Sequence, residues 1–178
     1  QIAEKEGKHV IDALLDIVVE DNMQTEFFGP AGRDNPQHMA EIANSPYVIA
    51  GLSDGGAQVK FVPGGVYPTD MLTWLVRDEG RLSLEEAHYK LSYLPAFLGG
   101  IKDRGFLREG AAADVVVYDL ENLALKPAEV VHDLPGGDWR RIQRAEGYRW
   151  VLVNGDITLE DGELTGALSG QLLRHGTG

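Results

Sequence analysis

The sequence predicts an α/β protein, with parallel βα units in its first part and antiparallel β-structure in its last part. Up to about residue 100, helical patterns alternate with short apolar runs, which is typical of parallel βα units. Residues 47–53 form a continuous apolar run, the pattern of a strand buried on both faces. After Asp103, β-rich runs alternate with turn signals, which indicates antiparallel strands. We therefore expect two parts, residues 1–104 and residues 105–178.

The composition is that of an ordinary soluble globular protein. The 178 residues are 43% hydrophobic and 25% charged, and the net charge is −12 at pH 7. Because nucleic acids and anionic membranes bind basic patches, we expect neither as a partner. The chain has no cysteine and no apolar run near the roughly 20 residues that span a bilayer. No signal-peptide pattern is present, so we expect a cytoplasmic protein. The missing initiator Met suggests that the chain begins inside a longer gene product.

The N-terminal region is expected to form a helix, a short strand and a second helix. Residues 4–20 carry apolar side chains at helical spacing, which are Ile11, Leu14, Leu15 and Val18. His9 lies within this predicted helix. Residues 25–28 are β-prone and precede Gly-Pro, which predicts a short strand. Asn35 followed by Pro36 predicts the start of the second helix, with Asn as the cap.

Asp54 follows the predicted strand at residues 47–53 and is the one credible catalytic carboxylate. In barrels and open parallel sheets, the C-terminal ends of the strands carry the reactive residues. Gly55 and Gly56 allow a sharp turn and leave the carboxylate uncrowded. The same pattern also fits a turn-capping aspartate, because Asp-Gly is a frequent turn signal. We expect substrate contacts in the loop that follows, which runs to Pro68.

Two more helices are expected before the antiparallel part. Residues 69–79 have helical periodicity, and Gly80 is placed to end that helix. Ser83 and Glu86 have the spacing of a capping box, which predicts a helix running to about Tyr93. His88 is expected on the surface of this second helix.

The C-terminal part is expected to be an antiparallel sheet after an irregular segment. Residues 113–119 are strongly β-prone, whereas residues 120–146 are polar and irregular. Asn154-Gly155 separates two β-rich runs, residues 149–153 and 156–159, which is a strong hairpin signal.

Apart from Asp54, the sequence offers little catalytic chemistry. It contains no Gly-rich phosphate loop and no Gly-x-Ser-x-Gly turn. The five histidines have no metal-binding spacing; they are His9, His38, His88, His132 and His175. Residues 138–141, Asp-Trp-Arg-Arg, could bind an anion, although a solvated loop fits this pattern better.

Five groups of segments follow one another in an order that matches a known family. They are residues 53–57, 67–69, 82–87, 103–105 with 107–119, and 151–155 with 160–167. Together they resemble the C-terminal part of N-acyl-D-amino-acid deacylases (D-aminoacylases) of the amidohydrolase superfamily. The resemblance covers nearly the whole chain.

This resemblance implies the last βα units of a metal-dependent (β/α)8 barrel, followed by the antiparallel C-terminal segment of a small β domain. It implies that Asp54 ends the eighth barrel strand, contacts zinc and handles the proton of the attacking water. Gly55 and Gly56 would lie on the substrate side of the site. The substrates implied are small N-acyl amino acids, which would give a carboxylate and a D-amino acid.

Two departures from the family pattern shape the functional expectation. The chain lacks the His-x-His strand and the other metal ligands, so we expect a fragment that cannot assemble the zinc site alone. Gln58 stands where many relatives have histidine, and Gln is a poor zinc ligand. Because barrel strands would be left with open edges, we expect a homo-oligomer or association with the missing half. Two alternatives stay open: a non-catalytic assembly module, and part of a cyclic-amide hydrolase such as a hydantoinase or dihydroorotase.

Overall fold

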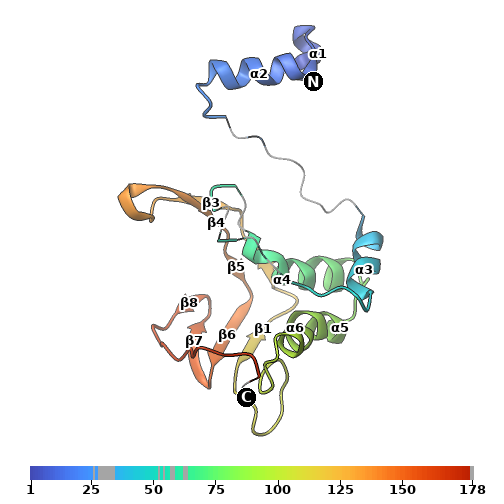
Figure 1. The fold of residues 1–178 in the computed structure, drawn as a ribbon, viewed down its shortest axis with the longest axis vertical. Helices are drawn as coiled ribbons and strands as arrows, with labels where there is room; N and C mark the ends of the chain where they lie inside the picture. The colour runs from blue at the N-terminus through green and yellow to red at the C-terminus, as the bar shows by residue number, and fades with distance from the viewer. Residues whose placement is uncertain are drawn as a thin grey trace. The chain divides into compact units, whose positions relative to one another are not determined.

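The chain forms two compact units, Gln1–Asp34 and Asn35–Gly178 (Figure 1). The computed structural model describes most of the chain, namely residues 1–25, 27, 35–51, 53, 55–56, 59–61 and 64–176. No helix among these residues is both long enough and apolar enough to cross a membrane. The predicted boundary between residues 104 and 105 lies within the second unit and stays a prediction.

The first unit contains two helices where the sequence predicted one. Helix α1 spans Ile2–Glu6 and α2 spans Val10–Glu20. Gly7 separates them in the left-handed conformation with φ 62°, which ends α1. His9 is therefore not a helix-interior residue: its Nδ1 accepts a hydrogen bond from the Ile11 amide at 3.2 Å and caps α2. Of the predicted strand at residues 25–28, Thr25 and Phe27 are described, and neither belongs to a strand.

The second unit begins with the predicted helix at Asn35. Helix α3 spans Pro36–Asn44, and the Asn35 side chain accepts a hydrogen bond from the His38 amide at 3.1 Å. This cap and the proline at the first position confirm the sequence prediction.

The predicted strand at residues 47–53 does not form in its described part. Residues 47–51 and 53 adopt turn and irregular backbone, and Tyr47 is 95% exposed. A strand needs a neighbour that pairs with its main-chain groups, and the apolar pattern does not supply one. The Val48 carbonyl instead accepts a hydrogen bond from Lys90 Nζ at 2.9 Å.

The central helices agree with the sequence in position, but they contain wider turns. The first helical run comprises η1 (Gly64–Val66), α4 (Tyr67–Asp70) and η2 (Met71–Asp78), and η2 is a π-helix. The second comprises α5 (Leu84–His88), the π-helical η3 (Tyr89–Tyr93) and α6 (Leu94–Leu98). The capping box predicted at Ser83 and Glu86 is present with both of its hydrogen bonds.

The C-terminal strands form the predicted antiparallel sheet. Strands β1 (Val115–Tyr118), β6 (Tyr148–Val153), β7 (Asp156–Glu160) and β8 (Glu163–Leu164) pair in this order. Asn154 and Gly155 connect β6 to β7 with φ 51° and 91°. Positive φ at both positions suits a two-residue hairpin turn, and the prediction is confirmed.

Residues 120–146, expected to be irregular, contain two small strand pairs. Strand β2 (Ala124–Leu125) pairs with β5 (Ala145–Glu146), and β3 (Glu129–Val131) pairs with β4 (Arg140–Ile142). The 3₁₀ turn η4 (Pro135–Gly137) joins the latter two. Strands of two or three residues are too short for a two-residue periodicity to appear in the sequence.

One apolar core joins the helices to the β-structure of the second unit. The core residues are Leu72, Leu75, Leu82, Ala87 and Leu123. Leu123 has no exposed surface and comes from the segment between β1 and β2. Helices α4 to α6 accordingly lie beside β1 and β6 (Figure 1).

Candidate functional site

The backbone beside Asp54 forms a tight turn, although Asp54 and Gln58 lie outside the described residues. The Gly55 amide donates a hydrogen bond to Ser53 Oγ at 3.3 Å. A Cβ atom added to Gly55 would come within 3.2 Å of the Gly65 amide nitrogen, so the loop approaches itself closely at this residue. Gly56 has no such constraint, because nothing lies within 4 Å of its added Cβ. Of the two glycines, Gly55 is therefore the one at which a larger side chain would require a small shift of the described backbone.

A cavity of about 490 Å³ opens beside this turn. Ser53 and Gly55 are the sequence neighbours of Asp54, and both line it. The remaining lining residues come from the start of the first helical run and from the β2–β5 region; they are Gly65, Val66, Thr69, Leu125, Gln143 and Ala145. The described lining residues are uncharged, so a charged group that acts on a ligand in this cavity would have to come from outside this set.

Thr69, in the wall of the cavity, is held by a hydrogen bond to the sheet. Thr69 is buried, and its Oγ1 lies 2.7 Å from the Tyr148 hydroxyl on β6. Tyr148 pairs with Tyr118 of β1, and their rings meet edge to face at 6.1 Å. The Tyr118 hydroxyl lies 2.6 Å from His88 Nε2. His88 was expected on the helix surface, but this hydrogen bond connects α5 to the sheet.

Burial is the main cause of an altered pKa in this group. It raises the pKa of the Tyr118 phenol, and the neighbouring Tyr148 raises it further. Tyr118 therefore keeps its proton in the neutral range and remains able to donate a hydrogen bond to His88.

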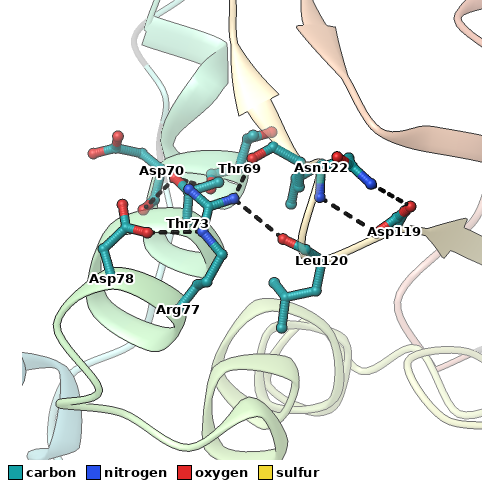
Figure 2. A network of polar contacts seen from close by, with 9 residues as sticks. Thr69, Asp70, Thr73, Arg77, Asp78, Asp119, Leu120 and Asn122 are labelled. Atoms are coloured by element: carbon teal, nitrogen blue, oxygen red, sulfur yellow. Dashed lines mark hydrogen bonds and ion pairs between the residues drawn. The ribbon is translucent and has the colours of Figure 1, made fainter.

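Arg77 makes a second hydrogen-bonded connection between the helices and the β-structure (Figure 2). Its Nη1 donates to the carbonyls of Leu120, at 3.1 Å, and Leu123, at 2.5 Å. Its Nε donates to Asp78 at 2.7 Å. The turn that carries these carbonyls is closed by Asp119, which accepts hydrogen bonds from the Asn122 side chain and amide. Those two bonds are the largest causes that lower the pKa of Asp119.

Residues 59–60, on the far side of the same loop, are held by Arg141. The Arg141 amide donates to the Val59 carbonyl at 2.7 Å, and its Nε donates to the Lys60 carbonyl at 3.0 Å. Lys60 Nζ in turn lies 2.8 Å from Asp138 Oδ1 and is the largest cause that lowers the pKa of Asp138. These contacts had no signal in the sequence, because the partners lie about 80 positions apart.

The sequence segment 138–141 shows no anion site in this geometry. Arg140 donates two hydrogen bonds of 2.7 Å to Asp133, which is the arrangement of a paired arginine. This contact also lowers the pKa of Asp133. The charges of this loop therefore serve to hold the protein's own chain together.

The described residues do not by themselves fit a zinc ion. Among them, no three histidine, aspartate or glutamate side chains lie close enough together to hold a metal. A zinc site that included Asp54 would need ligands beyond this described set.

Comparison with known proteins places the chain in a hydrolase family. Residues 2–159 match the model of the amidohydrolase family (Amidohydro_3). The chain therefore belongs to the amidohydrolase family, as the ordered motifs indicated.

Two of the relatives that match this chain are named as deacylases of N-acyl-D-amino acids. The chain is 38% identical over 109 residues to N-acyl-D-aspartate deacylase from Alcaligenes xylosoxydans xylosoxydans. It is 41% identical over 87 residues to the N-acyl-D-glutamate deacylase of the same organism. These matches cover 61% and 49% of this chain, but only 20% and 16% of the relatives. The chain thus matches a fifth or less of the length of each relative.

A crystal structure of D-aminoacylase is also similar. It has 31% sequence identity with this chain and a TM-score of 0.49, and the match covers 61% of this chain and 21% of that protein. Family membership rests on the sequence model for residues 2–159.

Proposed function

We propose that the chain supplies the C-terminal part of a metal-dependent hydrolase that deacylates N-acyl-D-amino acids. The observation that carries the proposal is the family match over residues 2–159 together with relatives named N-acyl-D-aspartate and N-acyl-D-glutamate deacylase. The reaction adds water across the amide bond and releases a carboxylate and a D-amino acid.

In this proposal Asp54 is the reactive carboxylate and one metal ligand. A carboxylate beside the scissile bond can take a proton from the attacking water and deliver it to the leaving amine. Gly55 and Gly56 give substrate room to approach that carboxylate. Zinc is the cofactor that the resemblance implies, and its other ligands would come from outside the described residues.

The architecture proposed for the whole enzyme assigns residues 1–104 to the end of a (β/α)8 barrel and residues 105–178 to a small β domain. The barrel strand at residues 47–53 would then form only beside a neighbouring strand. Association with the complementary part of the enzyme, or with another copy, would provide that neighbour. The partial coverage of the relatives supports this reading.

The test compares the 178-residue chain with the product of the longest reading frame that contains it. N-acetyl-D-aspartate, N-acetyl-D-glutamate and their L-enantiomers serve as substrates, with metal content measured on each protein. We expect turnover of the D-substrates by the longer protein only. Asp54→Asn should lower its kcat by about 10²–10⁴-fold, the range for a lost acid–base group.

Asp161→Asn is the matched control, because it makes the same chemical change in an exposed turn of the β tail. It should leave kcat unchanged. A longer protein that hydrolyses none of these substrates would contradict the deacylase proposal. Stoichiometric zinc and turnover in the 178-residue chain alone would contradict the proposal that the zinc site needs ligands from outside it.

A further inference from the structure

We infer that a second cavity, at the C-terminal end of α6, binds a small molecule that has an aromatic body and a carboxylate. Its volume is about 400 Å³, within the usual range of ligand pockets. It shares no lining residue with the cavity lined by Ser53 and Gly55. The inference therefore stands independently of the deacylase function.

One wall of the second cavity is aromatic. Tyr93 and Phe97 stack at 6.1 Å with an interplanar angle of 13°, and Phe106 lies 6.2 Å from Tyr93. Phe97 is 65% exposed, although a large aromatic side chain gains from burial. A flat apolar group placed against this wall would cover Phe97 and extend the existing stack.

Two cations at the cavity have no carboxylate partner. Neither Lys102 nor Arg108 forms an ion pair with any residue that the structure describes, although acidic residues outnumber basic ones 28 to 16. The Arg108 guanidinium lies 4.8 Å from the centre of the Phe106 ring, a contact that favours its place beside the aromatic wall. A ligand carboxylate could accept two hydrogen bonds from this guanidinium.

Arg104 also lines the cavity, but its role is to hold the loop in place. Its Nε donates to Asp114 at 2.7 Å, its Nη1 donates to Asp103 at 2.8 Å, and its Nη2 donates to Asn154. With its three nitrogens engaged, it adds little attraction for a ligand. The positive charge available to a ligand therefore belongs to Lys102 and Arg108.

The cavity is built before any ligand arrives. Gly105 has φ 87°, and a Cβ there would lie 2.8 Å from the Ser92 carbonyl, so the loop packs directly against η3 and α6. The Ile101 amide donates to the Ala96 carbonyl at 2.9 Å, and the Gly176 amide donates to the Gly100 carbonyl at 3.0 Å. A prearranged site spares a ligand the cost of ordering the loop.

The probe for this inference is naphthalene-2-carboxylate, titrated into ¹⁵N-labelled protein and followed by amide chemical shifts. We expect shifts at residues 93–108 with half-saturation on the order of 1 mM, because a ligand of this size gains limited affinity. Two control compounds each lack one half of the probe. Naphthalene-2-carboxamide has the aromatic body without the charge, and acetate has the carboxylate without the aromatic body. Each should bind at least about tenfold more weakly than the probe.

Two variants test the named side chains. Arg108→Gln removes the charge, and Phe97→Ala removes part of the wall; each should weaken binding about tenfold. Both side chains are exposed, so the fold should persist, and the dispersion of the amide spectrum reports it. Arg144→Gln, on the exposed β4–β5 connection, is the control and should bind the probe unchanged. Equal binding of the carboxylate and the carboxamide, shifts confined to other residues, or unchanged binding by Arg108→Gln would overturn the inference.

Discussion

Lys90 shows how a single residue positions the chain that leads to the candidate site. Its side chain is buried, with 7% of the residue exposed, and Nζ donates to the Ser45 and Val48 carbonyls at 2.7 and 2.9 Å. A buried ammonium is stable only when its donors are satisfied. These two bonds hold residues 45–48, where the chain leaves α3 toward Ser53.

Replacing Lys90 by methionine should destabilise the protein. Lys90→Met keeps much of the side-chain volume but removes the donor to both carbonyls; the Ser45 carbonyl keeps the 3.3 Å hydrogen bond from the Val48 amide, and the Val48 carbonyl loses the bond from Nζ. We expect the free energy of unfolding to fall by about 2–3 kcal/mol, measured by urea denaturation. Lys126→Met is the control, because Lys126 Nζ lies on the surface, 3.8 Å from Glu146, and the main-chain hydrogen bonds of Lys126 do not depend on its side chain. It should change stability by less than about 0.5 kcal/mol. Equal effects of the two substitutions would contradict the role of Lys90.

At the scale of an element, the capping box determines where α5 begins. The Ser83 side chain accepts from the Glu86 amide at 3.1 Å, and the Ser83 amide donates to Glu86 Oε2 at 3.0 Å. The hydrogen bond from the Ser83 amide is the largest cause that lowers the pKa of Glu86, and the Ser83 side chain adds to it. Both bonds favour the ionised carboxylate and close the first turn of the helix.

The pH dependence of this cap has a definite sign. Because the pKa of Glu86 is lower in the folded state, its contribution is fully present above its unfolded pKa and is lost as the pH falls through the folded value. An NMR titration should find the Glu86 carboxyl pKa below its ordinary value. In Ser83→Ala the pKa should rise only part of the way, because the backbone amide remains. Ser92→Ala, an exposed serine in the same helical run, should leave it unchanged, and an unshifted Glu86 in the parent protein would contradict the cap.

At the scale of the whole molecule, Leu123 links the helices of the second unit to its sheet. It comes from the β-rich part of the chain, yet it packs in the core with Leu72, Leu75 and Leu82 from the helical part. Its neighbour Gly147 lies so close that an added Cβ would be 2.6 Å from the Leu123 Cα. The tight packing on both sides predicts that helices and sheet unfold together.

Leu123→Ala tests this cooperativity. A cavity in a closely packed core should lower the free energy of unfolding by about 3–5 kcal/mol. Helical circular dichroism and the amide hydrogen exchange of β6 should report the same loss in the free energy of unfolding. Leu107→Ala, at a side chain that is mostly exposed, should have little effect. If only one of the two signals shifted, residues 1–104 and 105–178 would behave as separate domains.

Several features of the fold were predictable because their cause is local. Asn35 caps α3, Ser83 and Glu86 close the first turn of α5, and Asn154-Gly155 turns the β6–β7 hairpin. Each depends on hydrogen bonds or backbone angles within four residues, so the pattern in the sequence is sufficient. The short strands β2 to β5 were missed, since two or three residues give no periodicity.

The candidate site was predictable only in part, because most of its contacts join residues that are distant in the sequence. The ordered motifs identified the family and selected Asp54, whose catalytic and metal-binding role remains a proposal. The cavity lined by Ser53 and Gly55 depends on the contact of Thr69 with Tyr148, and residues 59–60 depend on Arg141; both pairs are far apart in sequence. Such pairs leave no local pattern that could have revealed them.

The sequence by itself therefore determined the helix caps, the hairpin turn, the antiparallel tail and the family. Only the tertiary structure decided that residues 47–51 lie outside a strand, that Lys90 bonds to the Ser45 carbonyl and His88 to Tyr118, and that the two cavities discussed above have different walls. The physical reason is the range of the forces. Caps and turns are satisfied by the nearest main-chain groups, whereas strand pairing, burial and cavity walls require partners that folding brings from distant positions.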